Sequence, residues 1–227
     1  SDRAARIRSA HDIPPQARVV MNIRRLMPHW GAMTVQRVAL SLLARRSDLH
    51  VVLLEGASDP TGMDAWLKQI ESRGWRDRVS VVRGHSPLQQ VADLMAVSDI
   101  GLSLVDSLEP CSLSVLQAAA AGGQLVIADQ ETYRALCRDG LHATLVAPGD
   151  DVGLIDGVLA RLDDAVAAAD VASANRSFIG RRFDHRQAML RLLRIVAGET
   201  AYRPSDRQDW SGWLSAQATK PGSEIAY

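Results

Sequence analysis

Cysteine is scarce in this sequence: its 227 residues contain two, Cys111 and Cys137. A small domain held together by disulfides needs more cysteines than that. Neither residue stands at a spacing typical of metal ligands, and no aspartate-any-aspartate pair occurs in a loop after a predicted strand. We therefore expect two free thiols, no metal site and no bound cofactor.

Long apolar runs are absent as well. No stretch approaches the about 18 consecutive apolar residues that a membrane-spanning helix requires. The N-terminal segment SDRAARIRSA also lacks the apolar core of a signal peptide. We therefore expect a cytoplasmic protein.

The chain has no surplus of charge of either sign, since 26 Lys and Arg residues balance 26 Asp and Glu residues. Nucleic-acid binding usually demands a basic surplus, so nucleic acid is not expected as the main partner. Hydrophobic residues make up 47% and charged residues 23%. These are ordinary values for a globular protein, and the length suits one large or two small domains.

Short apolar, β-branched runs alternate with longer helical patterns, which is typical of βα units on a parallel sheet. The near-continuous apolar character of these runs predicts strands covered on both faces. The fold class we expect is α/β, a Rossmann-like parallel sheet with helices on both faces. The predicted strands are RVVMNI, LHVVLLE, RVSVVRG, DIGLSLV, GQLVIAD and HATLVAP. The predicted helices among them are Thr34 to Arg45, Met63 to Gly74, Leu88 to Ser98, Ser112 to Ala121 and Thr132 to Arg138.

We assign residues 1–199 to this domain, with a linker or lead-in helix over 1–17, and residues 200–227 to a polar tail. A helix at about 152–164 and an alanine-rich stretch precede an arginine-rich helix, FDHRQAMLRLLRIVAG. Its basic face is either solvated or attracted to an anionic membrane or a partner. The arginines concerned are Arg181, Arg182, Arg186, Arg191 and Arg194.

Ligands of such sheets bind at the carboxyl ends of the strands. One loop there, EPCS, leads into the helix from Ser112, where Ser112 or Ser114 can act as the cap. The free N–H groups of this first turn either form an anion site or belong to an ordinary capped helix. Glu109 in the same loop is either a solvated acid or an acceptor for sugar hydroxyls.

The stretch EPCSLSVLQAAAAGGQLVIAD resembles the donor-binding segment of retaining GT-B glycosyltransferases of the family 4 type. The segment PPQARVVMNIRRLMPHWG looks like the first strand and phosphate-binding loop of that family. The helix FDHRQAMLRLLRIV looks like its closing helix. The similarity extends over about residues 6–196, and the order of its parts is more specific than any single motif.

The resemblance implies a C-terminal domain that binds a nucleotide-diphosphate sugar. Carried over by position, Arg25 would bind the diphosphate and Glu109 the hydroxyls of the transferred sugar. Gln117 would face the ribose. The backbone at Cys111, Ser112 and Leu113 would meet sugar and phosphate, and the base pocket would be lined by Gly84, His85 and Leu88.

Two departures from the family pattern bear on activity. Trp30 stands where the family carries a second phosphate-binding cation, and Gln117 stands where it carries a second acid. Arg24 either replaces this cation or, because it alternates with Arg25 along the chain, points to the other side of the strand. Two interpretations remain, a working enzyme with altered donor preference and a glycosyltransferase-like module used for binding or assembly.

Other candidate residues have simpler explanations. His29 and Trp30 either approach a ligand or pack, and His85 either contacts a nucleotide or is solvated. No histidine stands at a spacing that would activate Cys111 as a nucleophile. A receiver-type or flavodoxin-like domain is poorly supported, because the first strand ends in NIRR rather than in acids.

A complete enzyme of this kind has a second Rossmann-like domain that holds the acceptor. About 18 residues precede the first predicted strand, so we expect the acceptor domain to be missing from this chain. The chain is then either a fragment of a longer protein or works with a separate partner chain.

Overall fold

The computed structural model describes residues 2–27, 31–55, 60–83, 87–104 and 111–197. Within these ranges the strands form one parallel sheet of six, in the order β3-β2-β1-β4-β5-β6. Every strand expected from the sequence is present. The strands are β1 (Arg18–Leu26), β2 (Leu49–Glu55), β3 (Val79–Val82), β4 (Ile100–Ser103), β5 (Gln124–Ala128) and β6 (Thr144–Val146).

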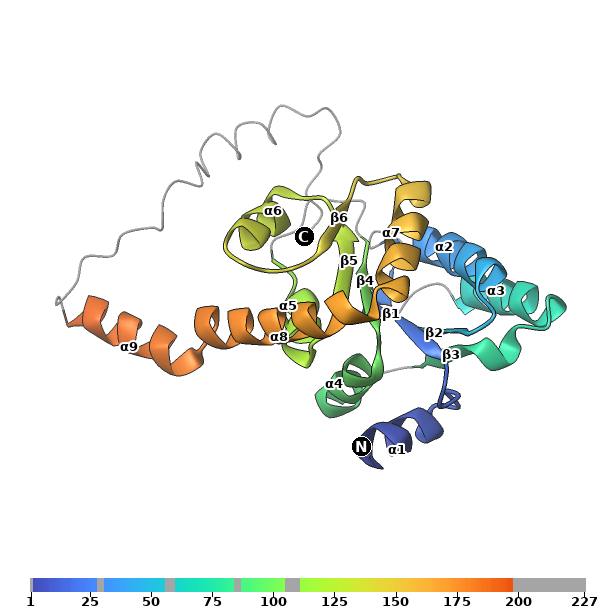
Figure 1. Cartoon of the computed structure of the whole chain (residues 1–227), viewed down its shortest axis with the longest axis horizontal. Helices are drawn as coiled ribbons and strands as arrows, with labels where there is room; N and C mark the ends of the chain where they lie inside the picture. The colour runs from blue at the N-terminus through green and yellow to red at the C-terminus, as the bar shows by residue number, and fades with distance from the viewer. Residues whose placement is uncertain (1, 28–30, 56–59, 84–86, 105–110, 198–227) are drawn as a thin grey trace. The chain divides into compact units, whose positions relative to one another are not determined.

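The described helices alternate with these strands, as expected for βα units (Figure 1). The first six are α1 (Asp2–Ala10), α2 (Ala32–Arg45), α3 (Pro60–Ser72), α4 (Leu88–Val97), α5 (Leu113–Ala121) and α6 (Glu131–Arg138). The last three are α7 (Asp151–Asp163), α8 (Ala165–Arg182) and α9 (His185–Val196). A single 3₁₀ turn, Arg76–Arg78, precedes β3. Among the described helices, none has the length and apolar character needed to cross a membrane.

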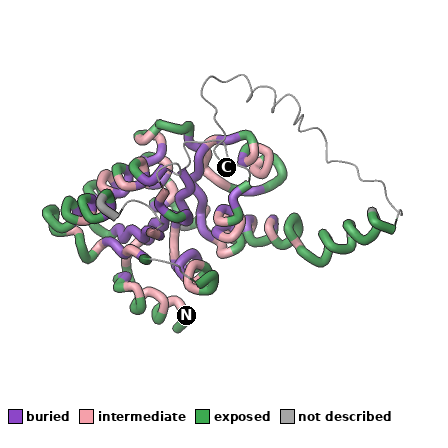
Figure 2. The backbone as a smooth tube through the Cα atoms, turned by 180° about the vertical axis from the view of Figure 1, so that it is seen from behind, coloured by how far each residue is buried: buried purple, intermediate pink, exposed green. Residues whose placement is uncertain are grey.

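The sheet is covered on both faces, which explains the near-continuous apolar strands. Successive residues of β1 pack into two hydrophobic cores, one on each face of the sheet. On one face, Val20 packs with side chains of α2, α3 and α7. Val19 and Met21 pack with side chains of α4, α5, α6 and α8. Figure 2 shows the buried residues following the strands and the helix sides that face them. The predicted α/β class, a Rossmann-like parallel sheet with helices on both faces, is confirmed.

The helical spacing noted in the sequence correctly identified the buried side of α3. Met63, Trp66 and Ile70 are all buried, and Leu67 packs against the same core. The Trp66 indole N–H also donates a hydrogen bond of 3.0 Å to the carbonyl of Gln36 in α2. The apolar stripe therefore joins two neighbouring helices on one face of the sheet.

The arginine-rich helix expected in FDHRQAMLRLLRIVAG is present as α9, but the assignment of Arg181 and Arg182 to the same helix is wrong. Arg181 and Arg182 end α8, whereas the later arginines belong to α9. The separation has a local cause: the Asp184 carboxylate accepts a hydrogen bond of 2.9 Å from the Gln187 N–H, which is the geometry of a helix cap. The chain divides into compact units between Arg182 and Phe183. The predicted boundary at residues 199 and 200 lies outside the described residues and stays a prediction.

The alanine-rich stretch continues as α8 because a buried amide holds the helix to the sheet domain. The Asn175 side chain is fully buried and donates to the carbonyl of His142 at 3.0 Å. It also accepts from the N–H of His142 at 2.8 Å. Phe178, one turn later, joins the core beside α5 and α6. Sequence reasoning did not single out either residue.

A buried histidine lies near the amino ends of β2 and β3. His50 is 1% exposed, and its Nε2 lies 2.8 Å from the Ser80 hydroxyl. That hydroxyl donates to the His11 carbonyl at 2.6 Å, so Nε2 must be the donor to Ser80. The Nδ1 atom is buried and has no hydrogen-bond partner within the described part of the chain. Burial, followed by the charge of Arg8, lowers the pKa of His50 from 6.5 to about 4.

This histidine is expected to make folding acid-sensitive. Below about pH 6.5 the histidine is protonated in the unfolded chain but stays neutral in the folded state. Neutral His50 therefore makes its full contribution to the unfolding free energy above that pH, and this contribution is lost as the pH falls toward 4. We expect a loss of about 2–3 kcal/mol of unfolding free energy over this window. Urea unfolding at a series of pH values measures it.

The His50→Gln variant serves as the reference for that pH series, because it cannot titrate. Its unfolding free energy should vary less with pH than that of the unmodified chain between pH 6.5 and 4. Parallel curves for the unmodified chain and His50→Gln would show that His50 is not responsible.

Candidate functional site

The strand order makes the carboxyl ends of β1 and β4 the topological switch point of the sheet, and the space beside these two strand ends is called the crevice below. These strands are neighbours, but the chain leaves β1 toward α2 on one face and leaves β4 toward α5 on the other face (Figure 1). Ligands of open α/β sheets bind where adjacent connections diverge in this way. The residues that follow β1 and β4 are therefore the candidate site.

At the end of β1, two adjacent arginines have different environments. Its pairing with β2 is interrupted between Asn22 and Arg25, and the Asn22 side-chain amide donates a hydrogen bond of 2.7 Å to the Arg24 carbonyl. Arg24 is buried at 7% exposure, whereas Arg25 is exposed. Irregular pairing of this kind commonly redirects side chains at the ends of strands. Of the two, Arg25 presents its guanidinium at the surface of the carboxyl edge.

The start of α2 lies directly against the end of β4. Gly31 precedes α2 with a φ of 72°, a conformation that favours glycine. A Cβ atom built on Gly31 would lie 2.8 Å from the carbonyl oxygen of Leu104. The Gly31 carbonyl accepts the first hydrogen bond of α2, from Val35 at 2.9 Å. Glycine therefore allows the connections after β1 and β4 to approach each other at the crevice.

The first turn of α5 lies on the other side of the crevice. Ser112 is the capping residue and is 6% exposed, but its side chain makes no capping hydrogen bond, contrary to the expected role. Its carbonyl accepts from the N–H groups of Val115 and Leu116 at 3.2 and 3.3 Å. The N–H groups of Leu113 and Ser114 come earlier and have no acceptor inside the helix. Such a turn favours an anion.

The side chains around this turn differ in exposure. Cys111 is exposed, Leu113 is 66% exposed, and Gln117, one turn later, is half-buried. Leu88, the first residue of α4, is 77% exposed. The predicted site residues Gly84, His85 and Glu109 lie outside the described residues, as do His29 and Trp30. Their assignments stay predictions.

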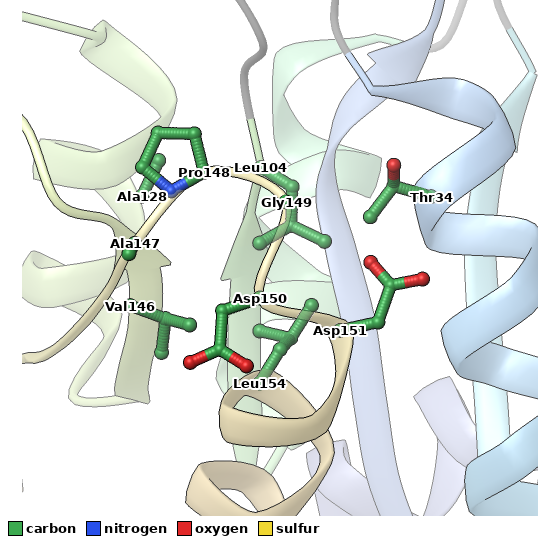
Figure 3. A pocket seen from close by; sticks show the side chains of 10 residues that line it. All are labelled: Thr34, Leu104, Ala128, Val146, Ala147, Pro148, Gly149, Asp150, Asp151 and Leu154. Carbon is green, nitrogen blue, oxygen red and sulfur yellow. The ribbon is translucent and has the colours of Figure 1, made fainter.

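A small cavity adjoins the same edge, at the ends of β4, β5 and β6 (Figure 3). Its volume of about 20 Å³ has room for about one water molecule, not for a nucleotide. The two acids in its lining hold helices: Asp150 caps α7 through the Gly153 N–H at 2.8 Å. Asp151 accepts a hydrogen bond of 3.0 Å from Arg37 in α2. Neither acid was singled out in the sequence.

The acid that follows β5 is also engaged. Asp129 accepts two hydrogen bonds of 2.6 Å from the Arg134 guanidinium, and this pairing lowers the pKa of Asp129. Neither Cys111 nor Cys137 forms a disulfide within the described part of the chain, and burial raises the pKa of the Cys137 thiol. Within the described ranges, no group of three or more His, Cys, Asp and Glu side chains is arranged to hold a metal ion. The described site therefore offers an arginine and backbone donors, which suit an anionic ligand.

Solved glycosyltransferases have the same fold. HepE from Anabaena, in a structure with UDP-glucose, superposes with a TM-score of 0.71 at 20% identity, covering 87% of this chain and 53% of that one. A glycosyltransferase from Rickettsia africae gives 0.73 at 14% identity, covering 88% and 53%. This chain thus spans about half the length of both. The C-terminal domain of a group 1 family protein from Francisella tularensis gives 0.66 at 14% identity, covering 78% of this chain and 91% of that domain.

Sequence comparison gives a family but no individual relative. No curated protein matches the sequence. The family described as "Glycosyl transferases group 1" matches residues 4–178. That match spans most of the sheet domain, including the ends of β1 and β4 and the start of α5. The chain belongs to the group 1 glycosyl transferases.

Proposed function

We propose that this chain is the donor-binding half of a retaining glycosyltransferase of the family 4 type, moving a hexose from a nucleotide-diphosphate sugar to an acceptor. The observation that carries the proposal is that Arg25 and Gly31, at and after the end of β1, and the first turn of α5, which follows β4, lie at the same edge of the sheet beside two neighbouring strands. A guanidinium and free helix N–H groups on two sides of one crevice match a diphosphate.

The chemistry assigned to these groups is stabilisation of the leaving diphosphate. When the bond to the sugar breaks, negative charge develops on the phosphate oxygen, and fixed donors lower the energy of that state. Arg25 supplies paired N–H donors, and the backbone of Ser112 and Leu113 supplies further ones. Front-face transfer needs no protein nucleophile, so positioning and charge stabilisation account for the rate.

The remaining assignments come from the family resemblance. Glu109 accepts hydrogen bonds from the transferred sugar, and Gln117 faces the ribose. Gly84, His85 and Leu88 line the base pocket. The structures of HepE with UDP and UDP-glucose make uridine the first base to test. Because this chain spans about half of that protein, the acceptor would be held by a further domain or partner.

A non-catalytic role in binding or assembly is the second candidate. It is favoured by Gln117, a neutral amide at the position of the second acid, and by Trp30 at the position of the second cation. The burial of Arg24 also means that this neighbour does not replace the missing cation at the surface. The two candidates differ in whether a nucleotide-diphosphate sugar binds.

Calorimetric titration separates them. The chain is titrated with UDP, GDP and ADP and with their glucose or mannose conjugates, at low and at physiological salt. The donor-domain proposal expects saturable binding of one base series that weakens with salt. Glu109→Ala should weaken binding of the conjugate and spare the diphosphate, while Glu131→Ala, at an exposed position on α6, should change neither. Absence of binding at millimolar ligand, in this chain and in the full-length protein, would favour the non-catalytic role.

A further inference from the structure

The end of β1 contains two residues more than the stretch of β2 beside it. Asn22 pairs with Leu53 and Arg25 pairs with Leu54, so the two residues between Asn22 and Arg25 are extra on the β1 side. Extra residues on one side of a strand pair form a β-bulge, which here lies between parallel strands. The printed pairing of β1 with β4 also extends only as far as Asn22. Regular pairing of β1 on both sides therefore reaches Asn22, and the bulge follows it.

This bulge decides how far Arg25 stands from the edge of the sheet. With unbroken pairing, Arg25 would lie two positions beyond the level of Leu54. At about 3.3 Å per residue, the bulge draws Arg25 back by about 7 Å along the strand. The side chain of Leu54 belongs to the core on the sheet face that α4 and α5 cover. Because paired residues of neighbouring strands lie on the same face, Arg25 lies on the face of α5.

A buried amide stabilises the bulge from within. Asn22 is 2% exposed, and its Nδ2 donates a hydrogen bond of 2.7 Å to the carbonyl of Arg24, one of the two extra residues. On either side Asn22 pairs with a buried leucine, Leu53 of β2 and Leu102 of β4. An amide is unfavourable in such surroundings unless it is hydrogen-bonded, and asparagine is a poor strand former. The bond to the bulge therefore accounts for an asparagine at this position.

A glycine of β4 makes room for the other extra residue. A Cβ atom built on Gly101 would lie 3.0 Å from Cγ2 of Ile23, closer than ordinary van der Waals contact. Ile23 is buried in the core on the face of α4 and α5. The bulge is thus packed from the side of β4 and hydrogen-bonded by Asn22. These two contacts indicate one fixed conformation at the end of β1.

We propose that Asn22 is a positioning residue for the diphosphate, because its amide stabilises the bulge that holds Arg25 level with Leu54 at the crevice. The inference rests on the proposed function, in which Arg25 binds the diphosphate. Asn22 is buried, so it acts through Arg25 and not by contact with the ligand. Donors that stabilise a developing charge are effective only when they are held in place beforehand, and a displacement of about 1 Å weakens them.

Calorimetric titration with UDP, GDP and ADP tests this role. Asn22→Val removes the amide donor and suits a strand, while Asn22→Ala removes it without adding volume. We expect both variants to bind the preferred diphosphate about five- to tenfold more weakly than the unmodified chain. Full affinity in both variants would overturn the role of Asn22 and leave the proposed function standing.

Gln124→Leu is the matched control for the loss of a buried amide. Gln124 is buried at the amino end of β5, and its Nε2 donates a hydrogen bond of 3.1 Å to the Arg161 carbonyl. The variant loses a comparable bond at the opposite edge of the sheet from the crevice, so it should keep full affinity. Equal weakening in Gln124→Leu and Asn22→Val would reduce the effect of Asn22 to general destabilisation, which overturns the proposal.

A double-mutant cycle shows whether Asn22 acts through Arg25. In the Arg25→Ala background, Asn22→Val should change the affinity by less than about twofold, because the side chain that it positions is already absent. The same five- to tenfold loss in both backgrounds, about the value expected for the single variant, would mean independent action and would overturn the proposal.

Arginine modification with phenylglyoxal tests the bulge without any ligand. Arg25 is exposed and Arg24 is buried, so Arg25 should react faster, and fragmentation in a mass spectrometer separates the two sites. In Asn22→Val the ratio of the two rates should fall about threefold or more, whereas Gln124→Leu should keep it. An unchanged ratio in Asn22→Val would overturn the proposal.

The two measurements together distinguish failure of this inference from failure of the proposed function. If the ratio falls in Asn22→Val but the unmodified chain and the full-length protein bind no nucleoside diphosphate, the proposed function has failed, and the role of Asn22 toward a diphosphate fails with it. If the unmodified chain binds a diphosphate and the ratio stays unchanged, the assignment of Asn22 alone is overturned.

Discussion

Arg25→Ala is expected to weaken the binding of a nucleoside diphosphate about 10- to 100-fold, which corresponds to about 1.4–2.7 kcal/mol. Arg25 is the exposed member of the arginine pair at the end of β1, beside the crevice to β4. Removing it takes away charge-assisted hydrogen bonds to phosphate oxygens. Calorimetry with UDP and UDP-glucose measures the loss, which should be similar for both ligands because the phosphates are common to them.

Two further variants show whether the effect comes from the donor geometry of Arg25. Arg25→Lys keeps the charge but loses the paired planar donors, so its affinity should lie between those of the original chain and Arg25→Ala. Arg45→Ala removes an exposed arginine at the other end of α2, where it pairs with Asp156 at 3.1 Å. Its affinity should match that of the original chain. Equal weakening by Arg45→Ala and Arg25→Ala would mean that Arg25 affects binding only through the net positive charge of the chain and not through direct hydrogen bonds to the phosphates.

The sheet could be predicted from the sequence because both faces of its strands are buried. Strands such as Leu49–Glu55 and Gln124–Ala128 are then apolar over most of their length, and the intervening helices keep a regular apolar stripe for the core. The direction of each βα crossover is also nearly fixed, so alternating elements leave few alternative topologies. The family resemblance added the placement of the site loops.

The features missed in the sequence depend on contacts between distant segments or on single hydrogen bonds. Asn175 looked like one polar residue in an alanine-rich stretch, but its partner His142 is 33 residues away. Asp184 reads as part of a continuous basic helix until its bond to Gln187 shows a new helix start. The interruption after Asn22 likewise depends on pairing with β2. None of these contacts produces a periodic pattern along the chain.

For the candidate site, too, some features were indicated by the sequence and others depend on the folded structure. The family resemblance assigned Arg25, and the position of the loop before Ser112 at the carboxyl end of a predicted strand indicated the turn there, because parallel strands bring those ends to one edge. Both site assignments stay predictions. The capping role expected of the Ser112 hydroxyl was wrong, since its side chain is buried without that bond. The close approach of Gly31 to Leu104 joins residues more than 70 positions apart, and only the folded sheet brings them together.

That approach gives the second large expected effect, on Gly31→Ala. Alanine at a φ of 72° is strained by about 1–2 kcal/mol. Its methyl group would also lie 2.8 Å from the Leu104 carbonyl oxygen, which is backbone and can move away only if the end of β4 or the start of α2 shifts. We expect a loss of about 2–4 kcal/mol in unfolding free energy, measured by urea denaturation.

Gly74→Ala separates backbone strain from the contact with Leu104. Gly74 has nearly the same φ, 70°, but a Cβ built on it meets no atom within 4 Å. Gly74→Ala should therefore show the strain alone and keep full affinity for the nucleoside diphosphate. Gly31→Ala should be less stable than Gly74→Ala and should bind the ligand more weakly, because one displaced connection directly follows the end of β1 that holds Arg25 and the other leads to the first turn of α5. Equal stability and affinity in the two variants would mean that the contact between Gly31 and Leu104 does not shape the crevice.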